Sequence, residues 1–408
     1  MHIALYHNLP SGGARRAVVE MAKGLVARGC IIDEYCPETA DLSFLPLDNY
    51  VRRSTVLPYE PLGVYNKRIP LLTPYISAAR LSHDLKAMAV LGQKTAEHLN
   101  RISYDAIFSH DCQLVFAPDV LRYVQLPSIH YFHIGARGLF IEDKKRDSTA
   151  ADLVALKEKY YTPAQKLFRW LRYRQSSNNF RAVDRILTNS NFSKDELRTT
   201  YGVTAQVCYL GVDVAKFRPL QIGRENFLLS VGAVHYHKGY RFLIRSLAQL
   251  SEKQRSPLII AANNSDPAEL RILRDLASEK GVNFTVRNIK DADEMVELYN
   301  RAAAFVYSPI REPWGLAAVE AMACGTPVVA VGEGGITESI VDGETGLLTP
   351  RDEKLFADVL NQVFANPGLA ARLGSGGVAR ARSHFTWDKT VDRLETHFHE
   401  LVLEHNAL

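Results

Sequence analysis

Two glutamates, Glu312 and Glu320, are the residues of this sequence best placed to do chemistry. Seven residues separate them in REPWGLAAVEAMACGTPVVAV (residues 311–331). The neighbours of Glu320 are small and apolar, which is typical of a buried helix, and a buried carboxylate is costly unless it is paired. Glu320 is therefore expected to meet either a ligand or an arginine of a neighbouring helix.

The spacing of the two glutamates places them on either side of a predicted helix start. A strand is expected to end near Ser308, and a helix to begin near Trp314 and Gly315. Glu320 would lie five residues into that helix, about 7 to 8 Å along its axis. The helix N-terminus offers unpaired N–H groups and a positive dipole end, which suit a phosphate or a hydroxyl. The two carboxylates could then hold hydroxyls at both ends of one ligand.

Two further loops follow predicted strands in the same half of the chain. VGAVHYHKGYRF (231–242) puts Lys238 ahead of a helix, where its ammonium could meet phosphates, and VVAVGEGGITESIV (328–341) puts Gly334 and Gly335 at a helix start. Glycines there allow close approach of the backbone to an anion. Three such loops favour a nucleotide ligand. There is no Walker loop and no G-x-G-x-x-G, so ATPase and dinucleotide-binding functions are not indicated.

The first half contains a second candidate group. In LPSIHYFHIGAR (126–137), His130 and His133 fall on opposite faces of a strand by the two-residue period, so a zinc pair is not favoured. Gly12 and Gly13 follow the first strand, where they either admit a phosphate or form a tight turn. The only D-x-D, at residues 291–293, is expected to cap a helix rather than to bind manganese.

The elements that would position these residues alternate along both halves of the chain. Helical spacing of apolar residues predicts a helix over 14–28, ended by Gly29, and a capping box predicts another that begins at Ser193. Alternating strands and helices indicate an α/β fold of doubly wound parallel sheets, whose ligands bind at the carboxyl ends of the strands. The expected strands lie at 2–7, 104–110, 126–134, 183–190, 226–234, 257–263, 283–288, 303–308 and 327–331.

The length of 408 residues suggests two domains. The polar stretch GVDVAKFRPLQIGREN places their boundary between residues 218 and 219, and the second sheet is expected to end by residue 385. Residues 386–408 form one last amphipathic helix. No apolar run is long enough to span a bilayer, and the start of the chain does not resemble a secretory signal. Five scattered cysteines fit a reducing cytoplasm, which is the expected location.

The charge is divided unevenly between the two halves. Residues 1–218 contain 29 basic and 21 acidic side chains, against 20 and 24 in the remainder, so the first half is expected to meet something anionic. In QKLFRWLRYRQ (165–175), apolar side chains gather on one side of a helical wheel. An in-plane helix on the inner face of an anionic membrane is one interpretation, and a solvated helix is the other. The candidate membrane contacts are Lys166, Arg169, Trp170 and Arg172.

The segment SPIREPWGLAAVEAMACGTPVVAVGEGGITESIVDGETGLL resembles the signature of family-four retaining glycosyltransferases of the GT-B fold. The resemblance extends over most of the chain, and its glutamate motif is more specific than the matches in the first half, ILTNSNFSKDEL and YLGVDVAKFRP. It implies two facing Rossmann-like doubly wound domains, with a C-terminal helix that crosses back to the first domain and a nucleotide-sugar donor between them.

The resemblance also implies roles for the second-half residues. Glu312 would contact hydroxyls of the transferred sugar, Glu320 the ribose hydroxyls, and Lys238 the diphosphate. The backbone N–H groups of Trp314, Gly315 and Leu316 would face the sugar and phosphate. No metal ion or other cofactor is then needed. The family usually has an arginine after the glycine equivalent to Gly232, where this sequence has Ala233, so Arg15, Arg16, His235 or His237 would have to assist Lys238.

In the first half, His133 matches the histidine that the family places beside the reacting sugar, and Arg137 would lie at the lip of the site. Gly12 and Gly13 would approach the donor phosphates. The family retains the anomeric configuration by a front-face attack in which the leaving diphosphate takes the acceptor proton. No protein base is therefore expected, and no pair of hydrolase-type carboxylates is evident.

The sequence thus predicts a metal-independent, retaining hexosyltransferase that uses a GDP- or UDP-sugar, with mannose favoured by the YFHIGAR segment. The expected acceptor is a lipid-linked or membrane-borne glycan. The alternatives are transfer to a soluble acceptor, a nucleotide-sugar epimerase, and a non-catalytic nucleotide-sugar-binding subunit, which Ala233 alone favours. No nucleic-acid partner is expected, and the sequence does not indicate an oligomeric state.

Overall fold

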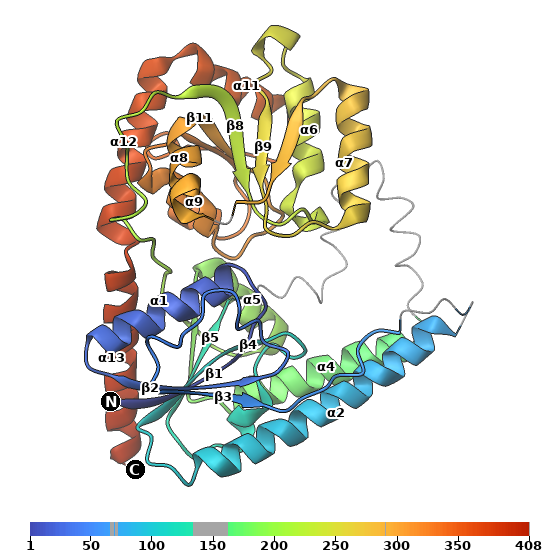
Figure 1. Ribbon diagram of the computed structural model, residues 1–408, viewed down its shortest axis with the longest axis vertical. Coiled ribbons are helices and arrows are strands. Elements are labelled where there is room, and N and C mark those ends of the chain that lie inside the picture. Colours follow the sequence, from blue (N-terminus) through green and yellow to red (C-terminus); the bar gives the residue numbers. More distant parts are fainter. Residues whose placement is uncertain (66–68, 70–71, 134–161, 290, 408) are drawn as a thin grey trace. The chain divides into compact units, whose positions relative to one another are not determined.

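The structure is a computed structural model that describes residues 1–65, 69, 72–133, 162–289 and 291–407 (Figure 1). The chain forms two compact units. Unit 1 comprises Met1–Cys208 together with Thr390–Leu408, and unit 2 comprises Tyr209–Lys389. The crossings between the units therefore lie at residues 208–209 and 389–390, whereas the sequence placed them near 218 and 385.

Unit 1 contains a seven-stranded parallel sheet in the order β3-β2-β1-β4-β5-β6-β7. The strand order reverses between β1 and β4, which is the kind of switch point at which open α/β sheets bind ligands. The strands are β1 (His2–Asn8), β2 (Ile31–Pro37), β3 (Arg53–Leu57), β4 (Ala106–Cys112), β5 (Ser128–Phe132), β6 (Arg185–Thr188) and β7 (Gln206–Val207).

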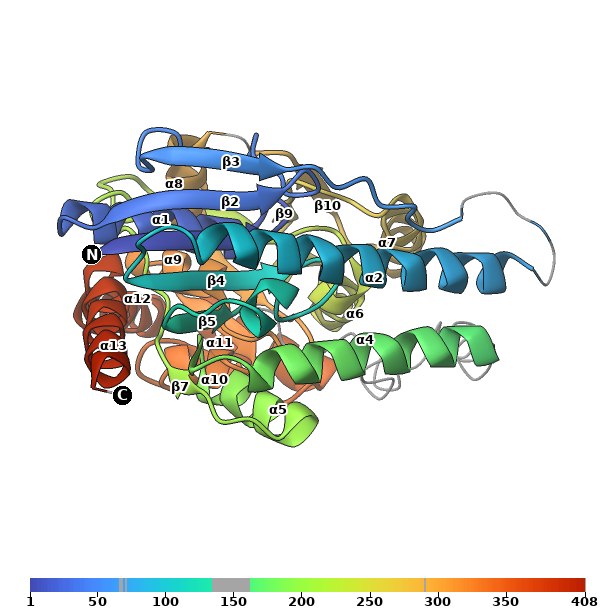
Figure 2. The same cartoon turned by 90° about the horizontal axis from the view of Figure 1, so that it is seen from below.

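Helices cover both faces of this sheet, because its central strands are apolar on both sides. Phe180 of α4 and Leu197 of α5 join one core cluster with Tyr6 of β1. On the other face Phe108 of β4 meets Phe398 of α13. Figure 2 shows α2 and α4 side by side. The unit 1 helices are α1 (Gly13–Ala27), α2 (Thr73–Leu99), η1 (Asp119–Arg122), α4 (Pro163–Arg181) and α5 (Asn191–Tyr201).

Unit 2 contains a six-stranded parallel sheet in the order β10-β9-β8-β11-β12-β13, which reverses between β8 and β11. Its strands are β8 (Glu225–Val231), β9 (Leu258–Ala261), β10 (Phe284–Arg287), β11 (Ala302–Tyr307), β12 (Val328–Val331) and β13 (Leu347–Thr349). Its helices are η4 (Tyr236–Lys238), α6 (Tyr240–Ala248), η5 (Glu252–Gln254), α7 (Pro267–Lys280), α8 (Ala292–Arg301), α9 (Leu316–Ala323), α10 (Ile336–Ser339), α11 (Glu353–Ala365) and α12 (Pro367–His384).

The last helix, α13 (Trp387–Asn406), begins in unit 2 and packs on unit 1. An added Cβ at Gly24 of α1 would lie 2.3 Å from Val391, so α1 and α13 pack closely. Arg185 binds Glu400 at 2.7 Å and Glu404 at 2.9 Å. The predicted return of the C-terminal helix to the first domain is therefore confirmed.

The N-caps of two helices, α8 and α5, were predicted from the sequence, the first correctly and the second not. Asp291 caps α8, accepting from the N–H of Asp293 at 2.9 Å, as predicted. The predicted start of α5 was wrong. Its N-cap is Ser190 and not Ser193, and the side chain of Ser190 accepts from the N–H of Ser193 at 3.0 Å. Both serines can serve as caps, and the chain uses the one closer to the end of β6 at Thr188.

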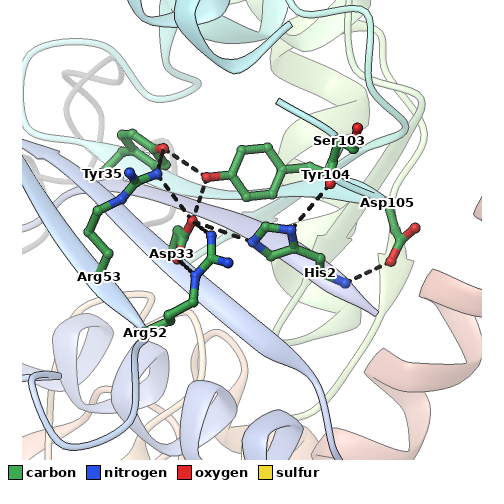
Figure 3. Close-up of polar contacts among 8 residues, drawn as sticks. All are labelled: His2, Asp33, Tyr35, Arg52, Arg53, Ser103, Tyr104 and Asp105. Carbon is green, nitrogen blue, oxygen red and sulfur yellow. Dashed lines mark hydrogen bonds and ion pairs between the residues drawn. The ribbon is translucent and has the colours of Figure 1, made fainter. Parts of the chain in front are cut away.

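A polar network at the amino ends of the unit 1 strands surrounds Asp33, a buried residue near the start of β2 (Figure 3). Arg52 donates to both carboxylate oxygens, at 2.9 and 2.6 Å, and the hydroxyl of Tyr104 donates at 2.7 Å. Burial alone would raise the pKa of Asp33, but these hydrogen bonds and the charge of Arg52 outweigh it and lower the pKa to about 2. The network joins β1, β2, β3 and the segment before β4.

We predict that Asp33→Asn reduces the free energy of unfolding by about 1 to 3 kcal/mol at pH 7, because hydrogen bonds to a charged acceptor are lost. A carboxyl whose pKa is lower in the folded chain stabilises the fold above its unfolded pKa. That contribution disappears as the pH falls from about 4 to about 2. Urea unfolding at pH 7 and at pH 3 should show a smaller difference between the two pH values for the variant than for wild type.

Asp105→Asn is the matched control, because Asp105 lies at the same amino ends of the strands and accepts from the backbone N–H of His2 at 2.7 Å. If Asp33→Asn and wild type lose equal stability between pH 7 and pH 3, the network does not contribute as proposed.

Candidate functional site

Lys238 and Glu312 meet at the switch point of the unit 2 sheet. Lys238 follows β8, Glu312 follows β11, and the ammonium lies 3.1 and 3.0 Å from the two carboxylate oxygens. Each side chain retains 19% of its exposure, so the pair is accessible. Two residues that the sequence assigned to one donor site therefore lie in contact.

The backbone of the loop after β11 packs against both neighbouring loops. Ile310 donates to the carbonyl of His237 at 2.8 Å, and Gly335 donates to the carbonyl of Glu312 at 2.8 Å. A Cβ added at Gly239 would lie 2.1 Å from the carbonyl oxygen of Ser308, and one added at Gly335 would lie 1.9 Å from the carbonyl oxygen of Pro313. The packing of these loops therefore requires glycine at both positions.

This packing corrects one interpretation of the sequence. Gly334 was expected to be a glycine so that an anion could approach the backbone. In the structure an added Cβ there would lie 2.4 Å from the carbonyl oxygen of Glu312. The neighbouring loop already occupies the space, and Gly334 and Glu312 form a parallel bridge. The two glycines therefore position Glu312.

Arg351, which the sequence analysis did not single out, fixes the same loop from beneath. Its guanidinium donates to the carbonyls of Ser308 and Pro309 at 3.0 Å and to the carboxylate of Glu333 at 3.0 Å. It also lies over the ring of Phe242, 5.2 Å from the centroid. One cation thus joins the ends of β11 and β12 and the core of unit 2.

Glu320 is 4% exposed and lies in α9, as predicted. The hydroxyl of Tyr299, in α8, donates to its carboxylate at 2.8 Å. Tyr299 is fully buried, so this hydroxyl fixes one oxygen of Glu320. Tyr299 could not be recognised from the sequence, because it is one aromatic residue on an ordinary amphipathic helix.

The start of α9 has the predicted position. Gly315 is its N-cap with φ +92°, a conformation that favours glycine, and the helix begins at Leu316. The buried ring of Trp314 packs between Tyr209 and Phe385, with ring centroids 5.0 Å apart in both contacts. The helix start follows the loop that bears Glu312 directly in the chain, and the first N–H groups of a helix have no partner within the helix itself.

The loop after β8 lacks an arginine at Ala233. Gly232 has φ +148°, and its carbonyl accepts from the hydroxyl of Tyr240 at 2.7 Å. The rings of His235 and His237 stack at 5.8 Å beside Lys238. Two imidazoles therefore lie beside the single lysine of this loop.

In unit 1, Gly12 and Gly13 begin α1, and added Cβ atoms at both would meet nothing within 4 Å among the described residues. Gly12 has φ +143°. The space at this helix start is open, and the half-buried Arg16 lies one turn further on. These three residues retain the positions expected of phosphate contacts.

Arg15 was also expected near an anionic ligand, and the structure corrects this. Arg15 is fully buried, and its guanidinium lies 2.7 Å from Nε2 of His7 and 3.1 Å from Glu34. Its charge is balanced inside unit 1, so it cannot reach a ligand without leaving Glu34. In α1, residue 15 lies on the buried side of the helix and residue 16 on the side nearer the solvent.

His7 and Glu34 also form, with Cys36, the one group of possible metal ligands found among the described residues. The guanidinium of Arg15 already lies against two of the three. Burial and the charge of Glu34 raise the pKa of Cys36 to about 12, so the thiol keeps its proton. This donor set fits an internal ion pair better than a divalent cation.

His133 is 6% exposed at the carboxyl end of β5. Its Nε2 lies 2.8 Å from Nδ1 of His110, at the end of β4, and its backbone N–H donates to Asp111 at 2.9 Å. Burial, followed by the charge of His130, lowers the pKa of His133 to about 3. His130 points to the other face, as predicted, and lies 2.9 Å from Ser109. Arg137 lies outside the described residues.

The prediction of buried and exposed sides from the helical wheel of α4 was partly wrong. Phe168 and Leu171 pack on a core cluster of unit 1, but Leu167, assigned to the same side, is 55% exposed. Arg172 was expected at the surface and instead lies over the ring of Phe116, 4.7 Å from the centroid. Its burial lowers its pKa. The exposed residues of this helix include Lys166, Leu167, Trp170 and Arg174, while Arg169 is half-buried.

We predict that Gly335→Ala displaces the loop that carries Glu312, because the new methyl group overlaps the Pro313 carbonyl. The φ of Gly335 is −67°, so alanine is not disfavoured by the backbone conformation itself. Overpacking of this kind costs about 1 to 3 kcal/mol. Hydrogen exchange of the Ile310 and Gly335 amides should become at least about tenfold faster.

Gly332→Ala, in the same loop, is the control, since its Cβ would meet neighbours at ordinary distances of 3.6 Å and more. Equal exchange rates in wild type and Gly335→Ala would show that the loop does not depend on this contact.

Comparison with known proteins agrees with this arrangement. Residues 11–216 match a family described as Glycosyltransferase Family 4, and residues 213–380 match one described as Glycosyl transferases group 1. A D-inositol 3-phosphate glycosyltransferase of Thermobifida fusca is 28% identical over 94% of this chain and 87% of its own length. One of Streptomyces bingchenggensis is 32% identical over 51% of each chain. The chain thus spans about half the length of the latter relative.

Solved structures share the fold. Sucrose-phosphate synthase from Thermosynechococcus elongatus has a TM-score of 0.72 at 21% identity and covers 99% of both chains. Anabaena HepE in complex with UDP-glucose has a TM-score of 0.67 at 18% identity, covering 98% of this chain and all of its own. The two Rossmann-like units thus form a GT-B fold, and the chain belongs to Glycosyltransferase Family 4.

Proposed function

We propose that this protein transfers a hexose from a nucleotide-diphosphate sugar to an acceptor hydroxyl, with retention of the anomeric configuration. The observation that carries the proposal is the accessible Lys238–Glu312 pair beside the start of α9. A cation, a carboxylate and free helix N–H groups at one switch point suit a ligand that has both a diphosphate and sugar hydroxyls. The complex of HepE with UDP-glucose is consistent with such a donor.

In this proposal the Lys238–Glu312 pair changes partners on binding. The diphosphate attracts the ammonium of Lys238, and the carboxylate of Glu312 is then free to accept hydrogen bonds from the sugar hydroxyls. Glu320, with one oxygen held by Tyr299, accepts from the ribose hydroxyls. The helix start at Trp314, Gly315 and Leu316 donates to the phosphate and sugar.

The transfer step needs no protein base. The bond between the anomeric carbon and the phosphate oxygen breaks, the acceptor oxygen bonds to the same face of that carbon, and the acceptor proton passes to the leaving diphosphate. Lys238 stabilises the charge that develops on the diphosphate. His235, His237 and Arg16 are the residues we propose to assist it in place of an arginine at Ala233. We propose that no metal ion takes part.

We propose a membrane-borne glycan as the acceptor and mannose as the sugar to test first. Support for the membrane comes from α4, where Leu167 and Trp170 are 55% and 51% exposed beside Lys166 and Arg174. Exposed apolar and basic side chains on one helix suit the boundary of an anionic bilayer. In the described part of the chain, no helix has the length and apolarity needed to cross a membrane. We propose that the protein binds at the cytoplasmic surface of the membrane through α4.

A soluble phosphorylated polyol is the second candidate acceptor. It is favoured by the names of the relatives, which are D-inositol 3-phosphate glycosyltransferases. The basic balance of residues 1–218 suits an acceptor phosphate as well as a lipid phosphate.

We predict that Glu320→Ala weakens nucleotide-sugar binding by about 1.5 to 3 kcal/mol, and that Glu320→Gln weakens it less, because an amide oxygen still accepts from hydroxyls. Thermal shifts with GDP-, UDP- and ADP-sugars, in the presence of EDTA, identify the donor. A ligand at about 100 times its dissociation constant stabilises the native state by about 2.7 kcal/mol. Transfer by the purified chain would exclude a purely binding role.

The exposed Glu344 supplies the control variant, Glu344→Ala. If Glu320→Ala melts early but keeps its affinity for the donor, Glu320 has a structural role only. Donor binding that requires manganese would contradict the proposed metal independence.

We predict that Leu167→Ser combined with Trp170→Ser weakens binding to anionic vesicles at least about tenfold, since burial of each apolar side chain contributes about 1.5 to 3 kcal/mol. Lys166→Ser should cost about 1 kcal/mol more. Co-sedimentation across a salt series measures both effects. Leu403→Ser, at a residue of α13 that is 70% exposed, should not change binding.

Transfer to a short soluble analogue should be the same in these variants, because no donor-site residue is altered. If wild type fails to sediment with anionic vesicles at low salt, the soluble polyol becomes the preferred acceptor.

A further inference from the structure

Three buried histidines form a row on one face of the unit 1 sheet. His7 lies one residue before the end of β1, His110 lies two residues before the end of β4, and His133 follows β5. β1, β4 and β5 are neighbours in the sheet. His110 pairs with Tyr131 in the register, and residues two apart point to the same side, so His110 and His133 share a face. Their rings are stacked with centroids 5.1 Å apart. His110 is thus the middle member of the row.

The contact between His110 and His133 allows only one proton. Nδ1 of His110 and Nε2 of His133 are 2.8 Å apart, so one of these nitrogens must donate and the other must accept. Within the described residues, neither Nε2 of His110 nor Nδ1 of His133 has a hydrogen-bond partner. The tautomer of His110 therefore determines whether His133 offers a donor or an acceptor through Nδ1.

The charges around the row favour one of the two arrangements. Nδ1 of His110 faces the β5 side, so its Nε2 faces the β1 side, from which His7 and Arg15 approach. Arg15 is a fully buried cation 2.7 Å from Nε2 of His7. Glu34 lies 2.8 Å from the same nitrogen and pairs with Arg15, and of these two groups Arg15 is the one whose charge lowers the pKa of His110. A bare nitrogen is more favourable than an N–H group toward a positive charge. The proton of His110 then belongs on Nδ1.

Both imidazoles stay neutral in this environment. Burial lowers the pKa of His110 well below its usual value, and His133, His7, His130 and Arg15 lower it further. The pKa of His133 falls to about 3 for the reasons given above. Two acidic groups lie close to the row. Asp111 accepts from the backbone N–H of His133 and lies 3.5 Å from Nε2 of His130. Glu34 contacts His7, Arg15 and Ser54. From α13, Arg393 adds another positive charge beside Tyr131.

We propose that His110 is a positioning residue that donates its Nδ1 proton to Nε2 of His133, and so leaves His133 with an Nδ1–H group for the ligand. The proposal rests on the transfer reaction proposed above. It gives His133 one role: it donates a hydrogen bond to an oxygen of the sugar or of the acceptor, and it does not accept a proton. Such a donor remains the same throughout the physiological pH range.

The first test observes the tautomer itself. Long-range proton–nitrogen spectra of the full chain labelled with [15N]histidine distinguish Nδ1–H from Nε2–H in a neutral imidazole, and the His133 signals are identified by their loss in His133→Asn. We expect Nδ1–H at His133 in wild type, unchanged from pH 5 to pH 8. In His110→Leu we expect a mixture of tautomers. In His110→Asn, whose amide offers an N–H near the former Nδ1, the wild-type tautomer should persist.

The second test measures hexose transfer from the donor that gives the largest thermal shift. His110→Leu should lower kcat/KM about tenfold, the effect of one misdirected hydrogen bond, and His110→Asn should restore most of it. His130→Asn is the control, because His130 is equally buried but lies on the opposite face. It should change transfer less than about twofold.

An Nε2–H tautomer at His133 in wild type would overturn the proposal, as would a His110→Leu variant with wild-type transfer. If no transfer is detected with any donor, the proposed function fails, but the spectra still decide the tautomer. If His110→Leu does not fold, the wild-type and His110→Asn spectra give the same decision.

Discussion

The structure of the candidate site depends on one backbone contact, the packing of the loop after β11 against the glycines of two neighbouring loops. Gly239 lies against the Ser308 carbonyl, and Gly335 lies against the Pro313 carbonyl, with no room for a side chain at either. Most of these contacts involve backbone atoms, and the side chains of Ser308 and Arg351 add hydrogen bonds that hold the same loop. Glu312 and Lys238 then face one another whatever the surrounding surface residues are.

Ion pairs stabilise the fold in addition to this packing. Buried charges in this protein have partners, as their desolvation requires. Arg351 is balanced by Glu333 beneath the donor loop, Arg15 by Glu34 in unit 1, and Asp33 by Arg52. At the candidate donor site the Lys238–Glu312 pair stays accessible, with 19% of each side chain exposed. An ion pair at a strand switch point can exchange one partner for a ligand at little cost in desolvation, whereas the buried pairs cannot.

Much of this arrangement could be predicted from the sequence, because it follows from local patterns. Apolar runs and helix signals within about ten residues predict β1, β4, β5, β6 and β8 to β12, the start of α9 and the position of Glu312 after β11. The strands β2, β3, β7 and β13 were not predicted. What could not be predicted depends on contacts between distant segments. Tyr299 reaches Glu320 from another helix, Arg351 lies 43 residues beyond Ser308, and His110 meets His133 across two strands.

Errors in the sequence analysis have the same origin. Arg15 and Arg172 carry charges that are usually exposed, and nothing near them in the sequence indicates Glu34 or Phe116 as partners. The wheel of α4 assigned Leu167 to the apolar side, but the core of unit 1 accommodates only Phe168 and Leu171 from that side. A helical wheel gives the direction of each side chain, and only the neighbouring elements decide how wide the buried stripe is.

The path of α13 has a consequence for the synthesis of the protein. Unit 2 is one continuous stretch, while unit 1 takes its last helix from residues 390–407. During translation, all the residues of unit 2 emerge before unit 1 has received α13. Until then Gly24 of α1 and the guanidinium of Arg185 lack their final partners. Unit 1 can therefore complete its packing only after the whole of unit 2 has been synthesised.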